Sequence, residues 1–244
     1  MSLEKPFAAA LRKEIARTTK QAAREIRHTH DVGGAINGHK HALRAIFVRH
    51  YRVISRAFFN RAIDAMGKSM RVRERKAPPT LTPVLVAEPA STDDAYATLW
   101  DSLQAQIATQ VDDISDTTRE QIQQRVADGV SNGDSWDDIA ASIEDLGIDS
   151  YRADVIARTE AHSVSNASTL DAADSLGLAL TKEWAATEDD RTRPDHAEAD
   201  GQEAEMDGTF IVGGAEMQYP GDPDGPPEQV INCRCVMLFN EKEG

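Results

Sequence analysis

"VINCRCVMLF", residues 230–239, closes a stretch rich in glycine and proline and is one of three short runs with a β-like pattern. The other two are "LALTKEWAAT" at 178–187 and "GTFIVGG" at 208–214. Apolar residues that alternate between turn-forming stretches predict strands. All of the strong helical patterns come earlier in the chain. Helices followed by a cluster of strands predict an α+β fold, with a helical N-terminal region and then helices packed on a small antiparallel sheet.

The chain has two cysteines, and both lie inside the first of these runs. On a strand, Cys233 and Cys235 would point to one face with Cα atoms about 6.6 Å apart. That separation is near the upper limit for a disulfide, and a redox pair normally has two residues between its cysteines. Two interpretations remain: a zinc site with His196 as a third ligand, or two small buried side chains. We favour burial, with Arg234 facing the other way.

Apolar periodicity predicts several helices before the strands. The second is expected at about residues 39–67, because three glycines in "HDVGGAINGHK" (30–40) should interrupt the helix before it. A longer helix should begin where Ser91 and Asp94 have capping-box spacing, and should end at "DGVSNGDS", where Gly129 and Gly133 act as breakers.

Two shorter helical patterns follow. Ser135 and Asp138 repeat the capping spacing and predict a short helix directly after them. The last helix is expected from about Ser150 to Leu176, with Gly177 as its C-terminal cap.

Charge divides the chain sharply. Residues 1–80 hold about 18 Lys and Arg against about 6 Asp and Glu, whereas the rest holds about 9 and about 35, within a total net charge of −14. We therefore expect a basic helical region at 1–80, a linker at 81–90 and an α+β domain at 91–244.

The basic region offers candidate contacts to DNA or a partner protein. These candidates form a stripe on the second helix and a basic run after it: Arg49, Arg52, Arg56, Arg71, Arg73, Arg75 and Lys76. No apolar run approaches the roughly 20 residues that span a bilayer, and the N-terminus lacks the apolar centre of a signal peptide. We expect that the protein does not associate with a membrane. We also expect that it is assembled in a cytoplasm-like compartment.

Polar residues gather in two motifs. In "TEDDRTRPDHAEADG" (187–201), Asp189 or Asp190 with His196 suggests either a general base pair, metal ligands or a salt-bridged loop, and we favour the loop. In the last predicted helix, Arg158, His162 and Asn166 are spaced i, i+4 and i+8 on one face. That face is well placed to hold a loop by hydrogen bonds.

These motifs occur in a fixed order. "RTEAHSVSNAS", Trp184, "DDRTRPDHAEADG", "PGDP", "PPEQ" and "NCRC" together resemble the phage Mu F-like head morphogenesis family over about residues 110–240. The resemblance implies a minor head protein of a tailed double-stranded DNA phage or prophage, located in the virion head or near the portal. Its implied partners are the portal protein and other capsid proteins, in some cases with double-stranded DNA, and the family supplies no catalytic residues to transfer. We expect no enzymatic activity and no cofactor.

The family motif falls on residues that we expect to brace the fold: Arg158, Glu160, Asn166, Trp184, Asp190, Arg191, Arg193, His196, Gly201, Pro220, Pro223, Asn232, Cys233 and Cys235. Some relatives carry an added toxin domain, and we expect none here because the chain ends soon after "NCRC". Two alternatives stay open. One is a metal-dependent hydrolase that acts on nucleic acid through Asp190, His196, Cys233 and Cys235. The other is a cytoplasmic DNA-binding protein unrelated to virions.

Overall fold

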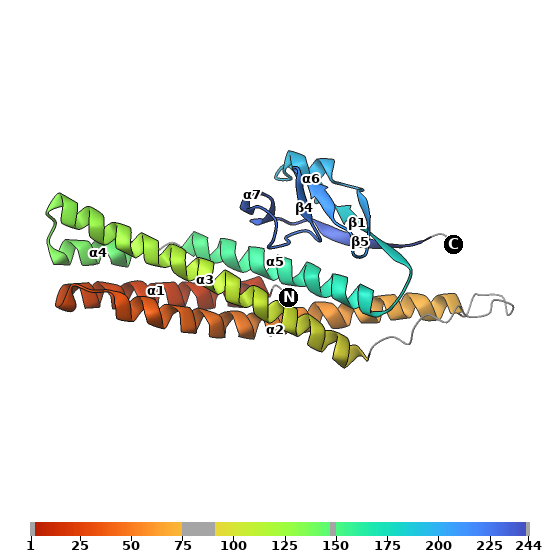
Figure 1. Cartoon of the computed structure of the whole chain (residues 1–244), viewed down its shortest axis with the longest axis horizontal. Helices are drawn as coiled ribbons and strands as arrows, with labels where there is room; N and C mark the ends of the chain where they lie inside the picture. Colours follow the sequence, from red (N-terminus) through yellow and green to blue (C-terminus); the bar gives the residue numbers. More distant parts are fainter. Residues whose placement is uncertain (1–2, 75–90, 147–149, 243–244) are drawn as a thin grey trace. The chain divides into compact units, whose positions relative to one another are not determined.

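A computed structural model describes residues 3–74, 91–146 and 150–242 of the chain. The fold is α+β, as predicted (Figure 1). The helices are α1 (Glu4–Thr29), α2 (Gly33–Glu74), α3 (Thr92–Asn132), α4 (Trp136–Leu146), α5 (Ser150–Ser175), α6 (Pro194–Glu198) and α7 (Pro227–Val230). The strands are β1 (Leu180–Ala185), β2 (Glu203–Glu205), β3 (Phe210–Val212), β4 (Ala215–Met217) and β5 (Val236–Glu241).

The chain forms two compact units, and their limits fall inside helices α2, α3 and α5. The first unit comprises Met1–Tyr51 and Gln104–Arg158, and the second comprises Arg52–Leu103 and Thr159–Gly244. The predicted linker at 81–90 lies outside the described residues, so that functional division stays a prediction.

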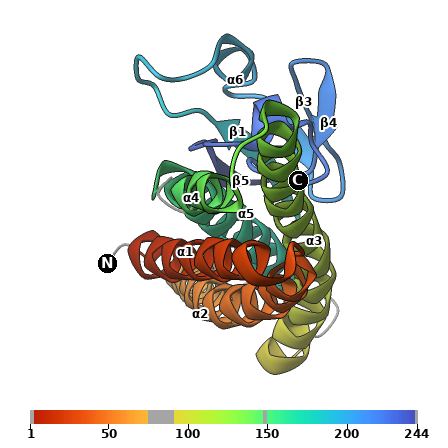
Figure 2. The same ribbon diagram turned by 90° about the vertical axis from the view of Figure 1, so that its left-hand side faces the viewer.

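The first unit is helical, and α1 packs against both α2 and α4 (Figure 2). Part of its core is a cluster of small and β-branched residues from four helices, and Ile26, Ile122 and Ile139 are almost fully buried in it. A buried polar group also joins α1 to α2. Glu14 accepts hydrogen bonds from Arg17 and Thr18, and it lies 3.4 Å from the His39 ring. Burial opposes the ionisation of Glu14, but these partners outweigh it and lower its pKa to about 2.

The predicted interruption in "HDVGGAINGHK" is confirmed, because α1 ends at Thr29, but the predicted bounds of the next helix were wrong. Helix α2 begins at Gly33, not near residue 39, and continues to Glu74, beyond residue 67. Side chains from outside the helix satisfy its first N–H groups. The Asp31 carboxylate accepts from Val32 and Gly33 at 2.8 and 3.2 Å, and Glu25 of α1 accepts from Ala35 at 2.9 Å. Capping of this kind offsets the low helix propensity of glycine.

Gly129 does not end α3, which continues to Asn132 before Gly133 adopts a φ of 76°. A Cβ placed on Gly129 would lie 2.3 Å from Cγ1 of Ile139 on α4. Gly129 therefore allows α4 to approach α3 closely, which is a packing role that helix propensity does not reveal.

The predicted capping pairs are confirmed. The amide of Asp94 donates to the Ser91 hydroxyl at 3.1 Å, and the amide of Asp138 donates to the Ser135 hydroxyl at 3.2 Å. Gly177, with a φ of 61°, follows the end of α5, as predicted.

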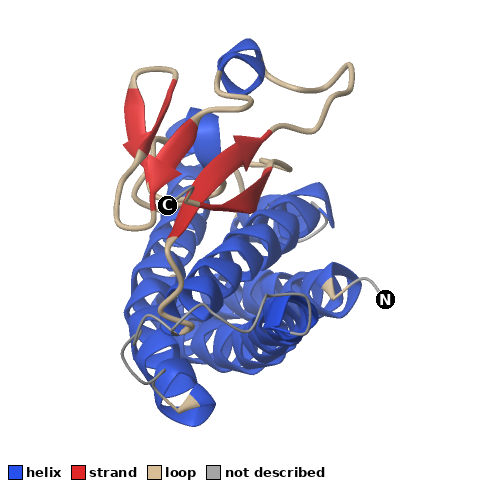
Figure 3. Cartoon of the chain, turned by 90° about the vertical axis from the view of Figure 1, so that its right-hand side faces the viewer, coloured by secondary structure: helices blue, strands red, loops and turns tan. Residues whose placement is uncertain are grey.

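The second unit contains the two small antiparallel sheets, drawn in red in Figure 3. The strand order of the larger sheet is β2-β1-β5, and β3 and β4 form a hairpin. Trp184 of β1 and Phe210 of β3 are fully buried in the core of this unit, with ring centroids 5.5 Å apart. Leu170 of α5 packs against the same core.

The cysteines do not lie on a strand, contrary to our prediction. Residues 227–230 form α7, β5 begins only at Val236, and Asn232 between them adopts a left-handed φ of 58°. The Cys233 amide donates to the Val230 carbonyl at 3.1 Å, which closes a turn. Both thiols are nevertheless buried and free of a disulfide, and Arg234 points outward, so the predicted burial is confirmed.

None of the helices in the described part of the chain is long and apolar enough to cross a membrane.

Candidate functional site

Asn166 on α5 joins two separate loops of the second unit. Its buried side-chain amide donates to the carbonyls of Pro220 and Cys235 at 2.8 and 3.3 Å, and it lies 3.0 Å from Nε2 of His162. The main-chain amide of Asn232 donates to the hydroxyl of Thr159, also on α5, at 3.1 Å. The prediction that a polar face of this helix holds a loop by hydrogen bonds is confirmed for Asn166.

The loop after β1 is fixed to the cysteine turn by Asp189 and Arg234. The guanidinium donates to both carboxylate oxygens at 2.5 and 2.6 Å. These hydrogen bonds from Arg234, together with the Arg191 amide, hold the pKa of Asp189 well below its usual range. Thr187 donates to the Arg234 carbonyl at 2.8 Å, and Arg193 donates to the carbonyl of Ile231.

Asp190 does not take part in an ion pair of this kind with Arg234. It is exposed, and its neighbour Asp189 makes the ion pair instead. The two carboxylates are adjacent in sequence, so residue type and spacing alone did not distinguish them.

His196, Cys233 and Cys235 form a compact buried group. The Nδ1 atom of His196 lies 3.3 Å from Sγ of Cys235 and 3.7 Å from Sγ of Cys233, and the three ligand atoms all lie within 4.8 Å of one another. Trp184 contacts the His196 ring edge to face, with centroids 5.6 Å apart. Within the described residues this group contains no carboxylate, so it does not include Asp190.

The two thiols share one hydrogen bond, which affects them in opposite directions. This hydrogen bond lowers the pKa of Cys235, and the hydrogen bond with the His196 ring lowers it further. The same hydrogen bond raises the pKa of Cys233, and burial raises that pKa further.

A second set of contacts lies behind the His196 ring. Its Nε2 atom lies 3.0 Å from Oε1 of Gln229, whose Nε2 donates to Asp195 at 2.7 Å. A Cβ on Gly213 would come within 2.3 Å of the Gln229 amide nitrogen and 2.6 Å of the Asp195 carboxylate. Sequence reasoning did not assign roles to Gln229 and Asp195, although both lie within the quoted motifs "PPEQ" and "DDRTRPDHAEADG".

The remaining motif residues lie in different surroundings. Glu160 is buried, and Gly201, with a φ of 73°, donates its amide to the Trp184 carbonyl at 2.8 Å. Arg191 is exposed and lies 3.6 Å from Asp189. Arg158 belongs to the first unit, where its side chain lies 4.0 Å from Glu4.

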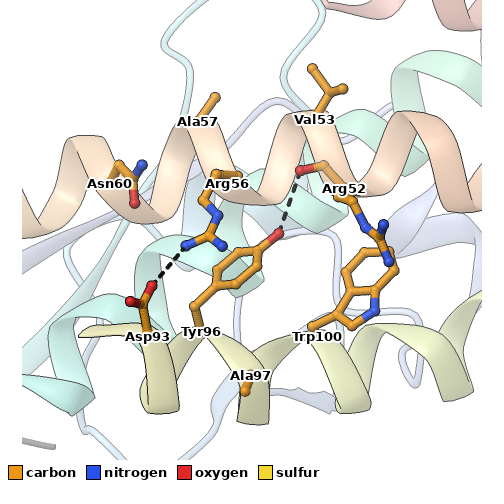
Figure 4. Close-up of a pocket in the computed structure, with 9 residues that line it drawn as sticks. All are labelled: Arg52, Val53, Arg56, Ala57, Asn60, Asp93, Tyr96, Ala97 and Trp100. Carbon is orange, nitrogen blue, oxygen red and sulfur yellow. Dashed lines mark hydrogen bonds and ion pairs between the residues drawn. The ribbon is translucent and has the colours of Figure 1, made fainter. Parts of the chain in front are cut away.

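The predicted basic contacts occupy different surroundings. Arg49 is exposed on α2 in the first unit. Arg52 and Arg56 lie in the second unit and line a pocket of about 870 Å³ between α2 and α3 (Figure 4). Arg52 stacks over Trp100 at 4.6 Å, and Arg56 stacks over Tyr96 at 3.7 Å.

The other four predicted contacts lie at or beyond the end of α2. Arg71 and Arg73 are in its last turns, and Arg75 and Lys76 lie outside the described residues.

Fold and site together define a small α+β domain whose polar motif connects one helix and two loops through side-chain to main-chain hydrogen bonds. Residues 120–238 match the family model described as "Phage Mu protein F like protein", the family that the order of the sequence motifs predicted. No solved structure gives a significant match to the chain.

Curated proteins with similar sequences include an enzyme and a phage head protein. The chain is 32% identical over 127 residues to the NAD(+)--arginine ADP-ribosyltransferase EFV of Enterococcus faecalis, and 29% identical over 119 residues to minor head protein GP7 of Bacillus phage SPP1. An uncharacterized protein of Haemophilus influenzae is 32% identical over 120 residues. These matches cover 50%, 47% and 49% of this chain, but only 26%, 38% and 24% of the respective relatives.

Proposed function

We propose that the chain is a non-enzymatic minor head protein that acts in head morphogenesis of a tailed double-stranded DNA phage or prophage. The observation that carries this proposal is the family match over residues 120–238, together with the similarity to a minor head protein. The virion is then its location, and other capsid proteins are its partners.

The motif geometry supports a bracing role over catalysis. Asn166 and the Asp189–Arg234 pair each connect segments that are far apart in the sequence, and their polar atoms are used in that connection. The similarity to an ADP-ribosyltransferase covers a quarter of that enzyme, so the enzyme's activity is not transferred to this chain. Asp190, which the hydrolase alternative requires, is not part of the His–Cys group.

We further propose that the chain contacts the portal and the packaged DNA. These contacts are supported by the basic composition of residues 1–80, which contrasts with the acidic remainder.

The test uses a phage or prophage that encodes this chain. We expect deletion of its gene to reduce infectious titre, and the wild-type chain to be recovered by mass spectrometry in purified heads. Asn166→Ala leaves two carbonyls without their buried donor and should destabilise the second unit by about 2–4 kcal/mol, which reduces incorporation.

Asp190→Ala is the matched control, since it changes an exposed residue of the same motif and should be incorporated like the wild type. Heads that lack the chain and are fully infectious would overturn the proposal. Copurification of the portal protein with incorporated chain would support the portal contact, and its absence would remove that part.

A further inference from the structure

We propose that His196, Cys233 and Cys235 bind one zinc-like soft divalent cation, which connects α6 to the turn between α7 and β5. The inference rests on these side chains alone and does not depend on a role in phage heads. Two thiolates and one imidazole are ligands that zinc prefers.

The distances from the imidazole nitrogen to the two sulfurs fit such an ion. A tetrahedral zinc with Zn–S bonds of about 2.3 Å and Zn–N bonds of about 2.0–2.1 Å places a sulfur and a nitrogen ligand about 3.5 Å apart. The two observed distances from Nδ1 of His196 to the sulfurs, 3.3 and 3.7 Å, lie on either side of this value. Both cysteines are free, so their sulfurs are available as ligands.

Hydrogen bonding fixes which nitrogen of His196 can accept the ion. The Asp195 carboxylate accepts from Nε2 of Gln229, so the amide oxygen of Gln229 must face the His196 ring. That oxygen accepts only, which places the ring hydrogen on Nε2 and leaves the lone pair of Nδ1 directed at the two sulfurs. Histidine ligands of metals commonly donate their second N–H in this way to a carbonyl or carboxylate.

Other residues stabilise this relay, the hydrogen bonds from His196 through Gln229 to Asp195. Gly213, with a φ of 58°, leaves room for both the Gln229 amide and the Asp195 carboxylate. Arg193, with Nη1 3.4 Å from Nε2 of His196, adds positive charge that offsets part of the charge of two thiolates.

His162, the other nearby histidine, already makes hydrogen bonds within the fold. Its Nε2 lies 3.0 Å from the Asn166 amide nitrogen, and its ring also hydrogen-bonds the Cys235 backbone. We therefore assign three protein ligands and leave the fourth position to a small exchangeable ligand such as water.

The first experiment uses the full, reduced wild-type chain and needs no variant. We expect elemental analysis to find one zinc per chain after purification from zinc-supplemented cells, and we expect Co²⁺ added to the metal-free protein to give a thiolate-to-cobalt charge-transfer band that saturates at one equivalent. Below about 0.1 ion per chain, with no such band in folded protein, the proposal is overturned. A mass lower by two hydrogens, which shows that the thiols have joined to each other in the native protein, also overturns it.

Variants then assign the ligands. Cys233→Ser, Cys235→Ser and His196→Gln should each abolish the cobalt band, and circular dichroism of each metal-free variant confirms that it is folded. Gln229→Leu keeps all three ligands but removes the hydrogen bonds of Gln229 to Nε2 of His196 and to Asp195, and it should weaken binding about 10- to 100-fold. Asp190→Asn is the matched control, because Asp190 is an exposed acid of the same motif that lies outside the His–Cys group, and its binding should match the wild type. A cobalt band that persists in all three ligand variants would contradict the assignment.

Discussion

Asp171 on α5 is a partly buried carboxyl group in a helix that otherwise serves packing and hydrogen bonding. Burial, with a smaller contribution from the negative charge of Asp174, raises its pKa to about 6. Because the folded state then holds this proton more tightly than the unfolded state, the group reduces stability as the pH rises from about 4 to about 6.

Asp171→Asn should therefore increase the free energy of unfolding at pH 7 and leave it nearly unchanged at pH 4. Urea denaturation at the two pH values measures this difference. Asp113→Asn, which makes the same substitution at an exposed aspartate on α3, is the control for the chemical change itself. An equal effect of Asp171→Asn at both pH values would mean that the carboxyl group is ionised in the same way in both states.

For individual residues, the sequence predicted the environment of the site better than its geometry. Burial of both thiols and the outward direction of Arg234 were expected from alternation along a strand, yet Asn232 produces them through a turn in the left-handed region. Alternation reports which side chains avoid water, and a turn can satisfy it as well as a strand. The relay from Asp195 through Gln229 was missed because it joins residues 34 positions apart, and no local pattern encodes that pairing.

Among the helices, the approach of α4 to α3 depends on one glycine. Gly129→Ala improves helix propensity by up to about 1 kcal/mol, but the new Cβ would collide with Ile139. We expect a net loss of about 1–3 kcal/mol in the free energy of unfolding, as overpacking of a core produces.

A double mutant tests the cause. Adding Ile139→Ala to Gly129→Ala removes the colliding side chain, so the double mutant should be more stable than the sum of the two single effects predicts. Simple additivity in thermal or urea melts would mean that the two residues do not meet.

Elements whose signals are local were predicted well, and those that depend on distant partners were not. The serine caps of α3 and α4 and the glycine after α5 each act within a few residues, and all three are confirmed. The start of α2 was wrong because Glu25, from the preceding helix, caps it. Strand β3 was predicted from three consecutive apolar residues, whereas β2 and β4, of the same length, each contain glutamate and depend on pairing with β1 and β3.

For the whole molecule, the division of charge leads to a prediction about DNA. The net charge of −14 opposes binding to a polyanion, so any binding must come from the basic residues before position 80. We expect the full chain to bind duplex DNA at low salt with an affinity that falls steeply as salt increases. Replacing Arg49, Arg52 and Arg56 by glutamine should reduce the salt slope by up to about 2.7, if each contacts one phosphate.

The matched control replaces three arginines of the acidic portion, Arg119, Arg125 and Arg191, and should leave the slope unchanged. Fluorescence anisotropy over a salt series measures both variants. An absence of binding by the wild-type chain at low salt would remove DNA from the proposed partners.

The buried thiols also provide a built-in reporter. They are the two cysteines of the chain, and both are covered in the folded state. A thiol-reactive dye can therefore modify them only during brief openings of the segment around Asn232, and the labelling rate counts those openings. The labelling rate can be compared between the free chain and purified heads without introducing a cysteine. A lower rate in heads would show that incorporation suppresses local opening of this part of the fold.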